Sequence, residues 1–129
     1  MDPFIIPPTD PREPLRVAMY CQTLWADTDF IGYQKTVITD TLRRCADVPP
    51  LLSTYIDNGY CANTQIRPDF QRLLLDVAAR KIDVIAVCDW GRLATTDGDM
   101  GQLLRFFYQH DTLVIECKTT PARLVLLAA

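Results

Sequence analysis

Short apolar runs alternate along the chain with longer stretches whose apolar residues recur at helical spacing. Each run is bounded by polar residues or prolines, which is typical of a strand buried on both faces. In the longer stretches, apolar residues fall at positions i, i+3, i+4 and i+7, which form one face of an amphipathic helix. The pattern predicts strands at 15–21, 51–56, 82–88 and 112–117, and helices at 31–46, 68–79 and 95–110.

The order of these elements predicts one α/β domain. Strands that alternate with helices form a mainly parallel sheet, because each crossover between parallel neighbours carries a helix to one face. We therefore expect a parallel sheet of four or five strands with helices on both faces. A last apolar run at 124–128 is too short to classify. The domain is predicted to cover residues 15–129.

The first 14 residues differ from the rest because they hold Pro3, Pro7, Pro8, Pro11 and Pro14. Such a density of proline excludes a helix and disfavours a central strand. Residues 1–14 are therefore predicted to form an extended tail. Two interpretations stay open: a solvated arm, or an arm that binds a partner through its apolar triplet at 4–6.

Composition narrows the class of protein. The formal charge is −3 and the sequence pI is about 4.9, so the basic surplus of a dedicated DNA-binding domain is absent. The five cysteines are odd in number, have no C-x-x-C spacing, and several lie inside apolar runs. This pattern favours buried free thiols in a reducing compartment over a metal site or disulfides. No run is long enough to cross a membrane and no signal peptide is recognised, so a cytoplasmic protein is expected.

Three segments carry a more specific signal, and all three include the end of a predicted strand. They are residues 16–25, 55–74 and 81–93. They resemble, in order and spacing, three segments of the serine recombinases: the first strand and loop Y-A-R-V-S-T, the segment D-x-G-x-S-G…R-P-x-F-x-x-L-L, and the loop D-R-L-S-R. Over residues 15–117 the chain thus resembles the N-terminal catalytic domain of the resolvase/invertase family, which implies a resolvase-like fold.

The resemblance implies a reaction that this chain lacks the nucleophile to perform. In the family, a serine hydroxyl attacks a DNA phosphodiester and holds the broken strand as a phosphoserine ester. Its position corresponds to Leu24, which has no nucleophilic atom. The chain has one serine, Ser53, inside a predicted strand. Thr23 is an alternative nucleophile, but it lies one residue out of register.

The arginines around the phosphate are also incomplete. Gln22 stands at one arginine position and Thr95 at another, and Gly91 replaces an acid, whereas two arginines and one aspartate match. Losing one preorganised donor typically costs about 10²–10³ in rate. We therefore expect no catalytic residue and a vestigial site made of Gln22, Leu24, Asp57, Arg67, Gly91, Arg92 and Thr95.

The retained and replaced side chains have more than one interpretation. Arg67 and Arg92 are candidates for binding a phosphate of DNA, or else they are structural, with Arg67 pairing an acid such as Asp57. Leu24 and Trp25 are candidates either for core packing or for a patch that contacts a partner.

The leading hypothesis is a catalytically inactive accessory or regulatory protein of DNA recombination or of a mobile element. It would act through a protein partner, such as an active recombinase, with no metal, cofactor or membrane. Whether it also contacts DNA stays open, and any such contact is expected to be weak. Family members continue into a long helix and a DNA-binding domain, which these 129 residues lack. The alternative is an active site-specific serine recombinase that uses Thr23 or a partner chain.

A third class of protein is a phosphoacceptor signalling domain. Asp89 after the third strand and Lys118 after the fourth resemble the aspartate and lysine of such receivers. The first strand ends Met19-Tyr20-Cys21-Gln22, without the acidic pair that would hold Mg²⁺. This interpretation therefore ranks last.

Overall fold

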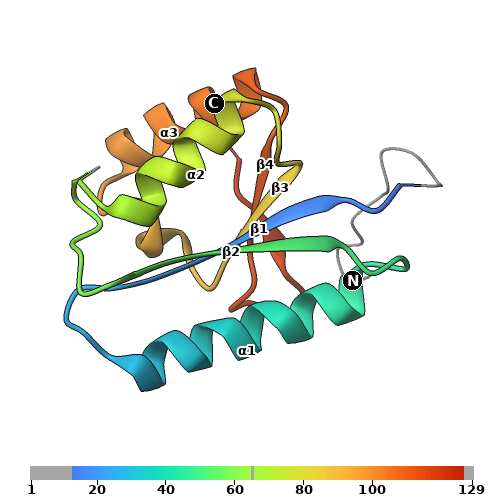
Figure 1. The fold of residues 1–129 in the computed structure, drawn as a ribbon, viewed down its shortest axis with the longest axis horizontal. Helices are drawn as coiled ribbons and strands as arrows, with labels where there is room; N and C mark the ends of the chain where they lie inside the picture. The colour runs from blue at the N-terminus through green and yellow to red at the C-terminus, as the bar shows by residue number, and fades with distance from the viewer. Residues whose placement is uncertain (1–12, 65, 127–129) are drawn as a thin grey trace.

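A computed structural model describes residues 13–64 and 66–126 and shows a five-stranded sheet with helices on both faces (Figure 1). The strands lie in the order β2-β1-β3-β4-β5. The first four are parallel, and β5 is antiparallel to β4. Their bounds are β1 (Arg16–Thr23), β2 (Leu51–Asn58), β3 (Val84–Val87), β4 (Leu113–Glu116) and β5 (Arg123–Leu124).

Three helices cover the sheet, and the predicted α/β architecture is confirmed. α1 (Thr28–Cys45) lies on one face, and α2 (Pro68–Ala78) and α3 (Asp97–Gln109) lie on the other (Figure 1). A separate buried apolar cluster fills each interface between sheet and helices. Because β1 and β3 are central, their side chains are covered from both faces, as their continuous apolar runs predict.

The helix ends follow from capping residues. The Asp27 carboxylate accepts the Phe30 N–H, so α1 begins three residues before the predicted start at 31. Thr96 caps α3 by accepting the Asp99 N–H at 3.1 Å, and Asp97 is the first residue inside the helix. Leu124, the first residue of the unclassified last apolar run, belongs to β5, a strand of two residues that begins at Arg123.

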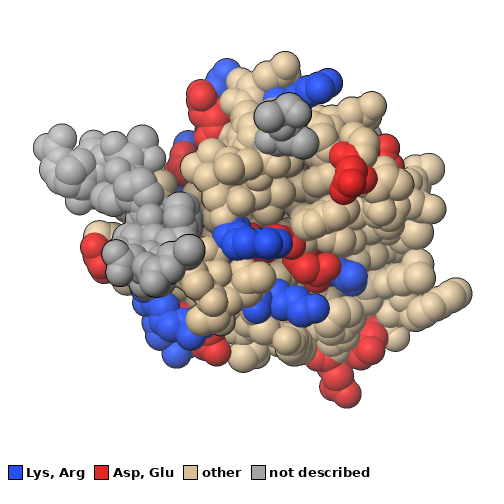
Figure 2. Space-filling model, turned by 180° about the vertical axis from the view of Figure 1, so that it is seen from behind, with Lys and Arg blue, Asp and Glu red and all other residues tan. Residues whose placement is uncertain are grey.

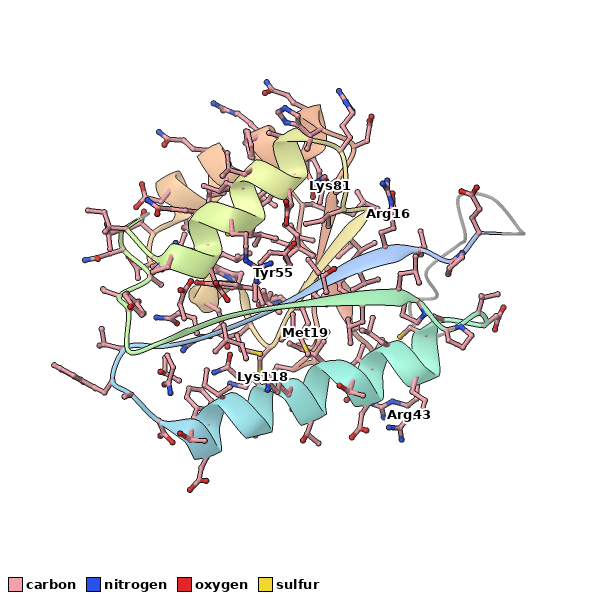
Figure 3. The ribbon with its side chains drawn as sticks, viewed as in Figure 1. Arg16, Met19, Arg43, Tyr55, Lys81 and Lys118 are labelled. Atoms are coloured by element: carbon pink, nitrogen blue, oxygen red, sulfur yellow. The ribbon has the colours of Figure 1, made fainter. Side chains whose placement is uncertain are left out.

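An ion pair between Arg16 and Asp83 connects the amino ends of β1 and β3. The Arg16 guanidinium donates to both carboxylate oxygens of Asp83, at 2.9 and 3.1 Å, and the Arg16 backbone N–H donates to the same carboxylate at 2.9 Å. Hydrogen bonds from Arg16 hold the pKa of Asp83 below its usual value. Figure 3 shows Arg16 at this end of the sheet, away from the loops that begin α1 and α2.

The cysteines agree only in part with the expectation of buried thiols. Four are buried and Cys61 is half-buried, and all five are free. Burial raises the pKa of Cys21 to about 11 and that of Cys117 to about 12, so both are protonated at neutral pH. Among the described residues, none of the helices has the length and apolar character needed to cross a membrane. The predicted tail, as far as residue 12, lies outside the described residues.

Candidate functional site

The carboxyl ends of β1, β2 and β3 bring the predicted site positions to one end of the sheet. In an open parallel sheet this is the end at which loops build a site. Gln22 and Leu24 come from the end of β1, Asp57 from the end of β2, and Arg92 from a 3₁₀ turn (Trp90–Arg92) after β3. Arg67 joins them from the residue before α2.

Arg67 is buried, with 1% of its surface exposed, and protein acceptors occupy all three of its nitrogens. Nε donates to the Thr64 carbonyl at 2.7 Å. The two terminal nitrogens donate to the carbonyls of Arg92 and Leu93 at 2.9 and 2.8 Å. The guanidinium also lies 3.7 Å from the centroid of the Phe70 ring. This arginine therefore ties the loop after β3 to the start of α2.

Arg67 does not pair directly with Asp57, so that specific prediction is wrong. Its guanidinium instead reaches the Tyr20 hydroxyl at 3.3 Å, and this hydroxyl donates to the Asp57 carboxylate at 2.7 Å. Asp57 is directed to the N-terminus of α2, where it accepts the Asp69 and Phe70 N–H groups, both at 2.9 Å. It thereby supplies the cap that Arg67, at the N-cap position, does not.

Arg92 is the more accessible of the two retained arginines. One terminal nitrogen donates to the Gln22 carbonyl at 3.0 Å, and Nε lies 3.4 Å from the Asp89 carboxylate without a hydrogen bond. A Cβ at Gly91 would lie 2.8 Å from that carboxylate. Asp89 therefore occupies the space beside Gly91. It places a carboxylate near Arg92 from a position two residues before Gly91.

The hydroxyl of Thr23 forms hydrogen bonds within the protein, to the turn at the end of β2, and does not point to the surface. Thr23 is buried, its Oγ donates to the Asn58 side-chain oxygen at 2.7 Å, and it accepts the Gly59 N–H at 3.0 Å. Gly59 has φ +93°, a conformation that favours glycine. The Gln22 side chain is buried as well and donates to the Tyr60 carbonyl. These bonds close the end of β1 onto the loop after β2.

Leu24 and Trp25 are exposed, by 50% and 80%, which excludes core packing for them. Thr95 is also exposed. The loop after β2 adds two exposed apolar side chains at the same end of the sheet, Tyr60 and Ile66. Residues 60 and 66 were not predicted as site residues, since neither matches a family position with a role in the chemistry.

The charges around the site are mixed. Figure 2 shows basic and acidic side chains interspersed on one face of the molecule, without a broad basic patch. Asp89 and Lys118 line a shallow hollow of about 250 Å³ with Phe30 and Tyr33, but they form no ion pair with each other; Asp89 pairs with Arg92. Within residues 13–64 and 66–126, no cluster of three or more possible metal ligands occurs.

Comparison with known proteins decides the family. Residues 27–126 match the family model described as the resolvase N-terminal domain. The chain belongs to the resolvase family. The matched range begins after β1, so it does not include positions 22–25. No curated protein matches the chain at a significant level.

Solved structures similar to this resolvase-family chain share its fold. The N-terminal catalytic domain of TP901-1 integrase has a TM-score of 0.71 at 23% identity, covering 80% of this chain and 78% of that one. The C-terminal catalytic domain of ISC1926 TnpA, an IS607-like serine recombinase, has 0.68 at 15%, covering 80% and 67%. A resolvase-family site-specific recombinase from Streptococcus pneumoniae has 0.62 at 16%, covering 81% and 72%. The predicted resolvase-like fold is confirmed.

Proposed function

We propose that this resolvase-family domain is catalytically inactive and acts by contact with another protein. The observation that carries the proposal is the absence of a usable hydroxyl at the end of β1. Position 24 is an exposed leucine, and the neighbouring Thr23 hydroxyl is buried and bonded to Asn58 and Gly59. A nucleophile must be free to reach the phosphate and must give its proton to a base, whereas the buried Thr23 hydroxyl donates to an amide oxygen, which is not a base, and accepts the Gly59 N–H.

The arginines support the same proposal. Arg67 would have to give up its contacts with Thr64, Arg92 and Leu93 before it could bind a phosphate. Arg92 is accessible, but Asp89 is already beside it. A negative charge at this position competes with an incoming phosphate. We therefore assign Arg67 a structural role and leave Arg92 as the one retained arginine of the vestigial site that could bind a phosphate of DNA.

The exposed apolar residues at this end of the sheet favour a protein partner. Leu24 and Trp25 stand in the loop after β1, with Tyr60 and Ile66 in the loop after β2. Aromatic and apolar side chains at this exposure are enriched in protein interfaces. The family membership and the similarity to an integrase and an IS607-like recombinase support a role in DNA recombination or a mobile element. An active recombinase is the partner we propose.

A search for a covalent DNA adduct tests catalytic inactivity. The purified chain is incubated with labelled supercoiled DNA, alone and with an active resolvase-family recombinase on its own recombination site. The products are denatured and mapped by mass spectrometry. We expect the active enzyme to carry an adduct and this chain to carry none. The Thr23→Ala variant of this chain should give the same result. An adduct on Thr23 of this chain would establish the alternative, an active recombinase.

DNA contact is tested separately by fluorescence anisotropy of a labelled duplex at about 50 and 200 mM salt, since neutralised phosphates release counterions. We expect binding weak enough that Arg92→Ala changes it little. Tight binding that falls steeply with salt and is lost in Arg92→Ala would instead favour a protein that occupies DNA. The exposed Arg105→Ala, on α3, is the matched control for loss of one positive charge.

A further inference from the structure

The outer edge of β2 is only half covered. The Leu51 N–H donates to the Leu15 carbonyl at 2.8 Å, so residue 51 directs its backbone groups toward β1. Because successive residues of a strand direct these groups to opposite sides, residues 52, 54 and 56 direct theirs outward. β2 is one of the two edge strands of the sheet, and no other strand formed by the described residues pairs with its outer side.

Two side chains of α2 cover the second half of this edge. The Asp69 carboxylate accepts the Ile56 N–H at 2.7 Å, and Arg72 donates to the Thr54 carbonyl at 3.0 Å. The guanidinium of Arg72 also lies 4.0 Å from the centroid of the Tyr55 ring. Charged side chains that occupy edge groups in this way prevent further strand pairing.

The first half of the edge has no such cover. Among the described residues, the outward N–H groups of Leu52 and Thr54 and the Leu52 carbonyl have no hydrogen-bond partner. The side chains of Leu51 and Leu52 are 60% and 44% exposed. A largely apolar groove of about 390 Å³ lies beside this half, between the end of α1 and the start of β2. It is lined by Thr39, Leu42, Arg43, Ala46, Asp47, Pro49, Pro50 and Leu52.

The chain itself contains a segment suited to this edge. Phe4, Ile5 and Ile6 lie between Pro3 and Pro7, so the triplet has three backbone N–H groups and is bounded by prolines. A residue that precedes proline is held in an extended conformation. The carbonyls of alternate residues in an extended triplet match the spacing of the alternate N–H groups of Leu52 and Thr54. The apolar side chains match the groove.

The tail is also long enough and attached at the right place. The described chain begins at residue 13, and the Leu15 carbonyl is already bonded to the start of β2. Figure 3 shows Arg16, at the start of β1, and Arg43, which lines the groove, at the same end of the molecule. The six residues between Ile6 and Glu13 give seven Cα–Cα steps, which span up to roughly 23 Å, whereas neighbouring strands lie about 4.8 Å apart.

We propose that residues 4–6 of the same chain dock on the open half of the β2 edge and insert their apolar side chains into the adjacent groove. The N-terminal tail is then an intramolecular cover for an edge that would otherwise recruit another strand. This inference is independent of the proposed function in recombination, because the groove lies at the end of the sheet opposite the site positions.

Amide hydrogen exchange of the full chain, followed by NMR, tests the proposal at Leu52 and Thr54. In the wild-type protein we expect both amides to exchange at least about tenfold more slowly than in a variant with Phe4→Ser, Ile5→Ser and Ile6→Ser together. A second tail variant, Thr9→Ser with Asp10→Ser, is the matched control and should keep the protection. The Leu51 amide, bonded to Leu15, should stay protected in every variant and reports that the fold is intact.

Three results would overturn the proposal. Fast exchange of both amides in the wild type would mean that the edge is open. Protection that survives in the triple variant would mean that something other than the triplet covers it. Protection that rises with protein concentration, together with a dimer in sedimentation, would assign the edge to a second copy of the chain.

Discussion

The two parts of the candidate site, one buried and one exposed, differ in what their side chains bind. In the buried part, Tyr20, Asp57 and Arg67 form one connected set of hydrogen bonds that reaches the N-terminus of α2 and the loop after β3. In the exposed part, Leu24 and Trp25 project from the loop after β1 with half or more of their surface accessible.

This difference explains how family positions can be retained under the proposed loss of the reaction. The buried residues that match the serine-recombinase pattern satisfy backbone groups that would otherwise lie unpaired inside the protein. Each such group costs about 1–3 kcal/mol when it loses its partner. A side chain with this structural duty is needed whether or not DNA is cleaved, whereas an exposed side chain at the end of β1 is free to differ.

Removing Arg67 should have the largest effect. In Arg67→Ala the carbonyls of Thr64, Arg92 and Leu93 lose their donor and a cavity forms beside Phe70. We expect the free energy of unfolding in urea to fall by about 3 kcal/mol. The exposed Arg105→Ala should change it by less than about 0.5 kcal/mol. A similarly small loss in Arg67→Ala would show that the buried part is not structural.

The sequence predicted the fold better than the contacts of the site. Apolar spacing located four strands and three helices because the sheet is covered on both faces and each helix presents one apolar side. The start of α1 was missed because a single cap, Asp27, decides it. β5 has only two residues, which carry no periodicity.

Contacts of the site depend on backbone positions that no spacing encodes. Arg67 binds carbonyls of the loop after β3, so its partners follow from the path of that loop rather than from any residue type. The prediction that it pairs with Asp57 failed because the Tyr20 hydroxyl stands between them. The family pattern places Asp57 and Arg67 at one end of the sheet, where the structure also has them, but it does not give their hydrogen-bond partners.

Asp57→Asn should have the second-largest effect. An amide keeps one acceptor but loses the negative charge at the N-terminus of α2, and its NH₂ group faces the N–H groups of Asp69 and Phe70 or the Tyr20 hydroxyl. We expect a loss of about 2 kcal/mol in the free energy of unfolding. The exposed Asp47→Asn is the matched control. Equal stability of the two variants would show that Asp57 does not stabilise the fold as part of the buried set of hydrogen bonds.

The pair of Arg16 and Asp83 gives a smaller effect that depends on pH. Arg16 lowers the pKa of Asp83 in the folded protein, so the pair stabilises the fold above the unfolded pKa of an aspartate, and this stabilisation is lost as the pH falls through the folded pKa. At pH 7, Asp83→Asn should lose about 1 kcal/mol, because the pair is partly exposed. Urea unfolding from neutral to acidic pH should show wild type and variant converging. A constant difference would assign the effect to shape rather than charge.

The smallest effect on stability, and the sharpest contrast with Arg67, is expected for the exposed part. Leu24→Ala and Trp25→Ala remove side chains that are mostly in water, so each should change the free energy of unfolding by less than about 0.5 kcal/mol. Binding to an active resolvase-family recombinase, measured by calorimetry, should weaken about tenfold or more for Trp25→Ala, because exposed aromatics that become buried dominate interfaces. The exposed Leu75→Ala, on α2, should leave binding unchanged. If Trp25→Ala binds as tightly as the wild type, the contact lies elsewhere; if it instead unfolds the domain, residue 25 belongs with the buried part and the contrast between the two parts fails.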